Sequence, residues 1–426
     1  MKRIVLLLPV FLAFAAAADF SEGERVAFLG DSITQGGRYV GYLQLFHNLR
    51  HPGSRTTFLN VGVSGDTATG GLKRFDWDVA PQKTDRVFVM FGMNDVDHGL
   101  YAEGKNGAEV DRQREAVFAR YRGNLAEIAG KVDALGAKLV PMTPTPFDEY
   151  AAKAGRAPER GCNEIGLRRM AEIVRETAAS NGTETVELFA PFTEILKRHP
   201  GRFQPDRVHP GEEGHILIAA AILLAQGETP LVGETAIDAS QLPYRYAPTA
   251  FPLPLTGDYR KADEVFPVTD NLNRETLVIR GLEPGLWILE ADGRPIGTFS
   301  AAALASGVNL ALLPTPNQLK AQELARTSAE LATTMTRLRG LAQVRLNLGD
   351  KAGDFTDRDR IFAALDAENA EREARKDAYA DYYRKVAENF KETWGKRPEF
   401  EKKVSDLRER LTAARPAAFM ISVRRK

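Results

Sequence analysis

The sequence predicts an α/β fold, in which a parallel sheet with helices on both faces is followed by a small β-module and a C-terminal helical region. Between residues 25 and 225, short apolar runs alternate with amphipathic helical stretches, and the runs are continuous, as in strands buried on both faces. Residues 265–313 hold short strand-like runs split by turn signals. Residues 317–414 carry helical periodicity.

The composition excludes several classes of protein. The 426 residues include 57 Lys and Arg and 57 Asp and Glu, and this zero net charge argues against a dedicated nucleic-acid binder. Hydrophobic residues make up 43% and charged residues 27%, which is typical of a globular chain rather than a disordered one. At roughly 150 residues per domain, the length predicts two or three domains.

The N-terminus has the pattern of a secretory signal peptide. Lys2 and Arg3 precede the apolar run Ile4–Phe14, and four alanines then lead to Asp19. No later segment approaches ~18 uninterrupted apolar residues. We therefore expect cleavage after residue 18, a periplasmic or secreted protein, and no integral membrane span after cleavage. The sole cysteine, Cys162, cannot form an internal disulfide and is expected to be a packing residue.

The elements of the α/β region follow in order along the chain. Apolar residues repeat at three- and four-residue steps from Phe118 to Leu135 and stop at Gly136, which predicts a helix. A second helix is expected between Ile165 and Thr177. The expected strands are Val26–Leu29, Thr57–Val61, Val87–Phe91, Leu139–Met142 and Thr185–Leu188.

Composition changes after residue 225. Residues 226–260 are rich in Pro, Gly and Thr and predict a surface connector, and three runs between residues 276 and 299 predict an antiparallel module. The apolar tail Phe419–Val423 predicts a final strand. The resulting division is a signal peptide at 1–18, an α/β domain at 19–228, a connector and β-module at 229–316, and a helical region at 317–426.

The helical region has two explanations. Leu324, Leu331 and Leu338 fall on one stripe, as in a coiled-coil arm or in a layer packed on the rest of the protein. The heptad spans only about two repeats, so we expect the packed layer.

Polar motifs follow the first three strands, and each alone has an ordinary explanation as a turn or a helix cap. Ser32, in Gly30-Asp31-Ser32, has the position of an exposed nucleophile at a strand-to-loop turn, which would need a base. Gly65 could bring a backbone N–H close to a developing oxyanion. Asn94 offers a neutral amide donor suited to the same task.

A fourth motif, Asp206-Arg207-Val208-His209, comes late in the chain. Asp206 could accept the Nδ1 proton of His209, which would leave Nε2 available as a base. Ligands bind at the carboxyl ends of parallel strands, and all four motifs fall at this edge. One active site explains the arrangement better than four unrelated loops.

These residues resemble the SGNH, or GDSL-type, hydrolase superfamily, whose blocks are Gly-Asp-Ser, a glycine, Gly-x-Asn-Asp and Asp-x-x-His in that order. The resemblance covers about residues 24–225, with Ile33 where the name-giving motif has leucine. It implies a flavodoxin-like three-layer α/β/α domain that hydrolyses esters through an acyl-enzyme. The implied roles are Ser32 as nucleophile, His209 as base, Asp206 as its partner, and the Ser32 N–H, Gly65 and Asn94 as the oxyanion hole.

Other motifs carry less weight. The spacing of His209 and His215 does not match a metal site, and a solvated helix start is the better explanation. No phosphate loop or dinucleotide fingerprint is present, so we expect no metal and no cofactor. His98 is expected in a surface loop, although it could line the site. The segment Arg74–Trp77 could form a sugar-binding rim, but core packing is more typical.

Together these features predict a secreted serine esterase that removes small acyl groups, above all O-acetyl groups, from carbohydrate. No long apolar lid helix is present to receive a fatty chain. The substrate would be a small-molecule or glycan ester. Two alternatives stay open, namely a lipase, lysophospholipase or thioesterase acting on longer acyl chains, and a non-catalytic glycan-binding protein.

Overall fold

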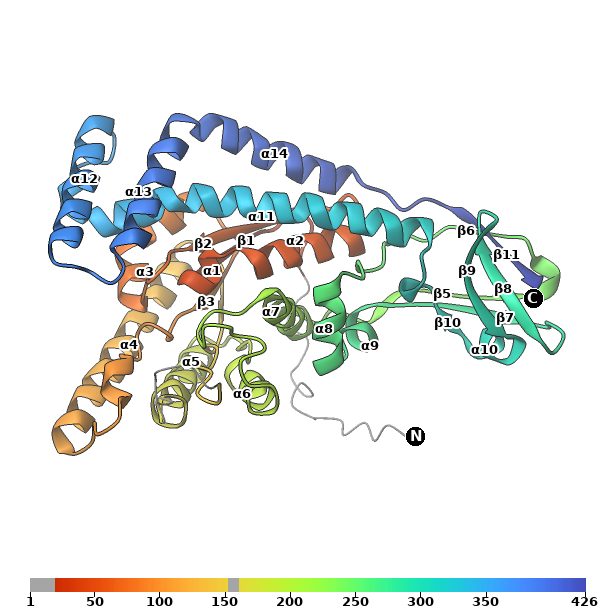
Figure 1. The fold of residues 1–426 in the computed structure, drawn as a ribbon, viewed down its shortest axis with the longest axis horizontal. Coiled ribbons are helices and arrows are strands. Elements are labelled where there is room, and N and C mark those ends of the chain that lie inside the picture. The colour runs from red at the N-terminus through yellow and green to blue at the C-terminus, as the bar shows by residue number, and fades with distance from the viewer. Residues whose placement is uncertain (1–19, 152–160) are drawn as a thin grey trace.

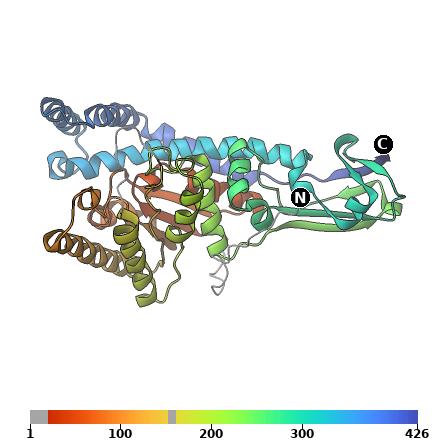
Figure 2. The same cartoon turned by 60° about the horizontal axis from the view of Figure 1, so that its bottom comes forward.

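The computed structural model describes residues 20–151 and 161–426, so the predicted signal peptide lies outside the described residues. The molecule is elongated, with a sheet and its covering helices at one end and a group of β-strands at the other (Figures 1 and 2). Within the described ranges, no helix is both long enough and apolar enough to cross a membrane.

Four parallel strands form the central sheet in the order β2-β1-β3-β4, which confirms the predicted α/β class. The register aligns Gly30 of β1 with Gly62 of β2 and Met90 of β3. Three carboxyl ends therefore finish level, and the loops that follow them lie at one edge. The strands are β1 (Arg25–Gly30), β2 (Thr57–Gly62), β3 (Arg86–Met90) and β4 (Lys138–Pro141).

The expected fifth strand is reduced to one parallel bridge between Met142 and Val186. The hydroxyl of Thr143 accepts hydrogen bonds from the backbone N–H groups of Leu188, at 2.7 Å, and Phe189, at 3.0 Å. These bonds hold the chain where helix α6 (Phe189–Arg198) begins, so the strand pairing stops after a single residue pair.

Helices cover both faces of the sheet, and alternate residues of β1 divide between two cores. Val26 and Phe28 pack with α2 and α7, whereas Ala27 and Leu29 pack with α4 and α5. This division explains why the strand is apolar at every position. The helices of this region are α1 (Ser32–Gln35), α2 (Arg38–Arg50), α3 (Ala68–Arg74), α4 (Ala108–Ala134), α5 (Arg168–Ser180) and α7 (Glu212–Ala225).

The β-module consists of two sheets, ordered β10-β7-β5 and β6-β11-β8-β9, around a shared apolar core. The final strand β11 pairs with β6 and β8, as the apolar tail predicts. The strands are β5 (Leu231–Asp238), β6 (Tyr244–Tyr246), β7 (Arg274–Arg280), β8 (Leu286–Ala291), β9 (Arg294–Ser300), β10 (Val308–Asn309) and β11 (Phe419–Arg425).

Two expectations about this module are wrong. Strands β5 and β6 form within the predicted connector, and β5 pairs with β7 in parallel, so the module is not wholly antiparallel. Parallel partners need a long crossover, and the chain between β5 and β7 supplies one that contains two helices. The helices of the module and its crossover are α8 (Gly257–Val265), α9 (Val268–Leu272) and α10 (Ala301–Ser306).

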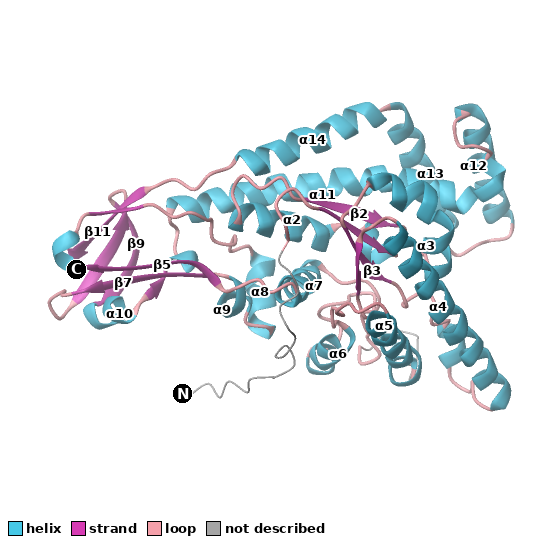
Figure 3. Cartoon of the chain, turned by 180° about the vertical axis from the view of Figure 1, so that it is seen from behind, coloured by secondary structure: helices cyan, strands magenta, loops and turns pink. Residues whose placement is uncertain are grey.

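The C-terminal helices form a packed layer, as expected. Leu324 and Leu331 of α11 are buried in the same core as α2 and α7, and α11 also contacts α14. Figures 1 and 3 show α11 extending along α2 from the β-module to α12 and α13. These helices are α11 (Pro316–Leu348), α12 (Arg358–Ala374), α13 (Ala380–Gly395) and α14 (Arg397–Ala413).

Candidate active site

Ser32 is the first residue of α1, directly beyond the end of β1. The side chain of Asp31 caps this helix by accepting a hydrogen bond from the Ile33 N–H at 2.9 Å. Helix α1 lies so close to β2 that a Cβ atom on Gly62 would overlap the backbone of Thr34 and Gln35. A glycine at the end of β2 therefore allows the turn that presents Ser32.

The structure brings Ser32, His209 and Asp206 into one line of hydrogen bonds. Ser32 Oγ lies 2.8 Å from His209 Nε2, and His209 Nδ1 lies 2.6 Å from Asp206 Oδ2. The other Asp206 oxygen accepts the backbone N–H groups of His209, at 2.7 Å, and Val208, at 3.0 Å. These contacts fix the imidazole ring with Nε2 directed at the serine.

The hydrogen bonds among these residues shift the pKa values of His209 and Asp206. The hydrogen bond that His209 donates to Asp206 raises the pKa of His209 above its ordinary value, although partial burial acts in the other direction. Burial opposes ionisation of Asp206, but the hydrogen bonds from His209 and from the backbone outweigh it and hold the pKa of this carboxyl well below its ordinary value. Asp206 is thus a carboxylate that stabilises a protonated His209.

The predicted oxyanion donors Gly65 and Asn94 lie in the loops after β2 and β3. Gly65 has a φ of 76°, in the left-handed region that glycine adopts readily. Asn94 Nδ2 donates to the backbone carbonyl of Asp66 at 2.8 Å, which ties the two loops together. Asp95 adds a second tie by accepting the Ala68 N–H at 2.9 Å.

A buried ion-pair network supports the loop after β2. Arg74 is fully buried and donates to Asp66 at 2.7 Å and to Asp78 at 2.5 Å, and it also binds the carbonyls of Gly30 and Val61 at the strand ends. Arg74 therefore belongs to the support of the site and not to a sugar-binding rim.

The two aromatic residues of the same segment are also occupied within the protein. Phe75 is buried, and the guanidinium of Arg345 in α11 lies 4.4 Å from the ring centre of Trp77. The core interpretation of this segment is the one that the structure supports.

Two more buried carboxyls lie behind the strand ends. Burial raises the pKa of Asp31 to about 7 and, for the same reason, the pKa of Asp95 to about 7. Each accepts backbone N–H groups, which limits the shift.

Sequence patterns missed the residues that helix α11 brings to the site. Arg339 and Gln343 are 9% and 2% exposed, and they bind Gly62 at the end of β2 and Gln35 at the end of α1, respectively. The available signal was the occurrence of polar residues on the buried stripe that also holds Leu331 and Met335.

His98, His215 and Cys162 each contact other residues of this domain. His98 Nε2 donates to the Met93 carbonyl at 3.0 Å, and His98 Nδ1 lies 3.5 Å from the Sγ of the buried Cys162. His215 is buried and stacks on Tyr39 with ring centres 6.0 Å apart, so the expected solvated helix start is wrong at this residue. Burial lowers the pKa of His215 to about 3, with a further contribution from the charge of Arg38.

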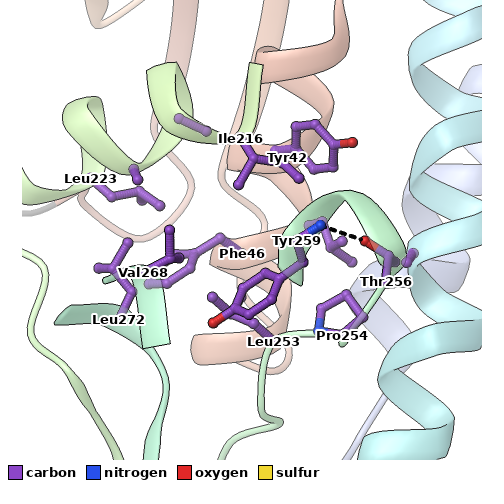
Figure 4. Close-up of a pocket in the computed structure, with 14 residues that line it drawn as sticks. Tyr42, Phe46, Ile216, Leu223, Leu253, Pro254, Thr256, Tyr259, Val268 and Leu272 are labelled. Carbon is purple, nitrogen blue, oxygen red and sulfur yellow. Dashed lines mark hydrogen bonds between the residues drawn. The ribbon is translucent and has the colours of Figure 1, made fainter. Parts of the chain in front are cut away.

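Hollows in this half of the protein differ in character, and two of them bear on the site. A polar hollow at the predicted oxyanion donor Asn94 is lined by Thr67, Thr69, Asn94 and Arg120, among others. An apolar pocket of about 60 Å³ lies between α2, α7, α8 and α9 (Figure 4). None of the five predicted site residues lines the apolar pocket.

Within residues 20–151 and 161–426, one group of three side chains could hold a metal ion. Ligand atoms of His47, His51 and Glu228 lie within 4.8 Å of one another at the end of α2. This group shares no residue with the line formed by Ser32, His209 and Asp206.

Comparisons with known proteins identify the family of one part of the chain. The model of the GDSL-like lipase/acylhydrolase family matches residues 28–217. An acetylxylan esterase of Geobacillus stearothermophilus is 27% identical over 217 residues, which cover 47% of this chain and 93% of that protein. The uncharacterized lipoprotein YqeF of Bacillus subtilis is 33% identical over 160 residues, covering 36% of this chain and 61% of that protein.

A similarity also extends over the regions outside the family match. The solved structure of BT4096, a gut microbial diltiazem-metabolizing enzyme, has 27% sequence identity and a TM-score of 0.81, and the match covers 96% of this chain and 99% of that one. Residues 28–217 therefore form a GDSL-like lipase/acylhydrolase domain of the SGNH hydrolase superfamily.

Proposed function

We propose that this acylhydrolase is a secreted serine esterase that removes small acyl groups, above all O-acetyl groups, from carbohydrate. The observation that carries the proposal is the unbroken line of hydrogen bonds from Ser32 through His209 to Asp206. A serine hydroxyl is a weak nucleophile, and an adjacent imidazole held by a carboxylate is the arrangement that activates it.

In the proposed reaction, Ser32 Oγ attacks the ester carbonyl carbon while His209 Nε2 takes the hydroxyl proton. The oxyanion receives hydrogen bonds from the Ser32 and Gly65 N–H groups and from Asn94. The C–O bond to the alcohol then breaks, and His209 returns its proton to the leaving alcohol. Water, deprotonated by His209, cleaves the acyl-Ser32 ester and releases the carboxylic acid.

Two observations support a short acyl group on a polar alcohol. The hollow beside Asn94 is lined by hydroxyl, amide and charged side chains, which suit a polyhydroxylated substrate. The apolar pocket, which would suit an acyl chain, is lined by none of the proposed catalytic residues. The similarity to an acetylxylan esterase points to the same class of substrate.

Acetate release from acetylated xylo-oligosaccharides and other acetylated glycans tests the proposal directly. We expect turnover by the wild type, loss of turnover in Ser32→Ala, and full activity in the control Ser180→Ala on the exposed end of α5. A series of p-nitrophenyl esters from acetate to palmitate should favour acetate, and a preference for palmitate would establish the lipase alternative. Binding of glycans without acetate release would establish the binding-protein alternative.

Export is tested separately, by the mass of the mature protein. Cleavage after residue 18 gives a chain that begins at Asp19, in the periplasm or the culture medium. Recovery of full-length chain in the cytoplasm would contradict secretion and leave the esterase proposal intact.

A further inference from the structure

Helix α11 holds two buried polar side chains near the oxyanion loop, defined here as residues 62–66. Arg339 binds the loop directly, and Gln343 binds Gln35, whose side chain binds the loop. The two residues are four positions apart, so they lie one turn apart on the same face of the helix. Helix α11 lies outside residues 28–217, which match the acylhydrolase family model. Its contacts with the loop therefore join two separate parts of the chain.

Gln343 acts on the loop through Gln35. The side-chain carbonyl of Gln35 accepts the backbone N–H of Ser64, and its amide nitrogen donates to Gln343 Oε1 at 3.0 Å. Gln343 Nε2 in turn donates to the hydroxyl of Tyr382 in α13 at 2.9 Å. Each amide is oriented by the next, so Gln35 presents its oxygen, and not its nitrogen, to Ser64.

The same helix holds the backbone of Gln35 as well. Thr336 of α11 donates from Oγ1 to the Gln35 carbonyl at 3.0 Å. Gln35 is the last residue of α1, whose first residue is Ser32, so one short element connects the proposed nucleophile to this contact.

Arg339 holds the first residue of the loop. Its Nε donates to the Gly62 carbonyl at 3.1 Å, and its two terminal nitrogens bind Asp78 at 2.7 and 2.6 Å. Asp78 is shared with Arg74, which also binds the Asp66 side chain. The backbone carbonyl of Asp66 accepts the Asn94 amide, so the network continues to the second oxyanion donor.

We propose that α11 is a positioning element of the esterase site, with Gln343 and Arg339 holding the oxyanion loop in register with Ser32. This inference rests on the proposed function. A hydrogen-bond donor stabilises an oxyanion only if it is aimed before the charge develops. Gly65 has open space where a Cβ would lie, and hydrogen bonds hold the residues on either side of it, at the Ser64 N–H and the Asp66 carbonyl.

Gln343→Met in the full-length chain removes both hydrogen bonds of Gln343 while nearly preserving its volume. We expect kcat for p-nitrophenyl acetate to fall roughly tenfold or more, with KM changed less than about twofold, because an oxyanion donor acts in the transition state. Gln343→Glu should recover most of the activity, since its carboxylate can accept from both Gln35 and Tyr382.

Gln318→Met is the matched control. Gln318 is the same residue type in the same helix, is equally buried, and binds the carbonyls of Leu253 and Ala311 away from the site. We expect this variant to lower the melting temperature at least as much as Gln343→Met and to leave kcat unchanged. Equal losses of kcat in Gln343→Met and Gln318→Met would show that α11 has a structural role only, and would overturn the inference.

Amide hydrogen exchange provides a readout that does not require activity. In Gln343→Met, the Ser64 amide should exchange at least about tenfold faster than in the wild type, whereas Gln318→Met should leave its exchange unchanged. Unchanged exchange in Gln343→Met would overturn the inference. Faster exchange in a protein whose wild type hydrolyses no ester would contradict the proposed function and leave the support of the loop by Gln343 established.

Discussion

His209 Nδ1 lies 2.6 Å from Asp206 Oδ2, and the backbone N–H of His209 donates to the other oxygen of the same carboxylate at 2.7 Å. One side chain thus holds both the ring and the backbone of the histidine three positions later. His209 Nε2 is thereby directed toward Ser32 Oγ, which lies 2.8 Å away. This relationship leads to the first prediction.

Asp206→Asn should lower kcat by on the order of 10³–10⁴, because an amide favours the wrong tautomer of the base. The base works when neutral, so activity rises with pH through the pKa of His209. Asp206 raises that pKa, and its neutral replacement should therefore move the acidic limb of the kcat/KM profile to lower pH. Profiles of wild type, Asp206→Asn and the surface control Asp258→Asn test this, and an unmoved limb in Asp206→Asn would contradict it.

Asn94→Ala should lower kcat by about 10²–10³ with a small change in KM, as expected for the loss of one oxyanion donor. Steady-state kinetics on p-nitrophenyl acetate measure the effect. Asn124→Ala is the matched control, because Asn124 is also an amide donor in this region but binds Thr69 at 2.6 Å. A loss confined to KM would show that Asn94 binds substrate and does not stabilise the transition state.

Asp31→Asn should stabilise the protein at alkaline pH. The pKa of Asp31 is about 7 in the folded protein, against 3.8 ordinarily, because the carboxyl is buried. Between these values the folded state holds a proton that the unfolded state has lost, so stability falls as pH rises and is constant above about 7. The neutral asparagine can still accept from Ile33 and avoids this loss.

Urea unfolding at pH 4 and pH 8 measures the effect. We expect Asp31→Asn to gain about 1–3 kcal/mol over the wild type at pH 8 and much less at pH 4. Asp133→Asn, on the exposed side of α4, should show no such difference. The same gain at both pH values would mean that ionisation of Asp31 is not its source.

Arg74→Met should destabilise the protein by about 3–5 kcal/mol, because it leaves Asp66 and Asp78 buried beside one another with one arginine removed. Burial already raises the pKa of Asp66 despite the charge of Arg74. Urea unfolding of this variant and of Lys73→Met, which alters the exposed neighbour, provides the comparison. Similar stabilities for the two variants would show that the buried network contributes little.

Several features followed from local pattern alone. Strands β1 to β4 lie at the predicted positions, because residues buried on both faces produce continuous apolar runs. The packed helical layer and the last strand were also predictable. The apolar residues of the layer recur with a helical period, and those of the last strand form a short apolar run. The fifth strand was not, because a single side chain, Thr143, ends its ladder through bonds to residues 45 and 46 positions away.

By itself, the sequence determined the parallel α/β class, the order of the four motifs and the identity of the residues at the strand ends, because these depend on periodicity and on neighbours along the chain. Only the tertiary structure decided which distant groups meet. Arg339 and Gln343 lie about 300 residues from the loop and helix that they hold, separated by 277 and 308 positions from Gly62 and Gln35. A buried polar residue in a helix has many potential partners, and its choice is set by how the helix packs, which local pattern does not encode.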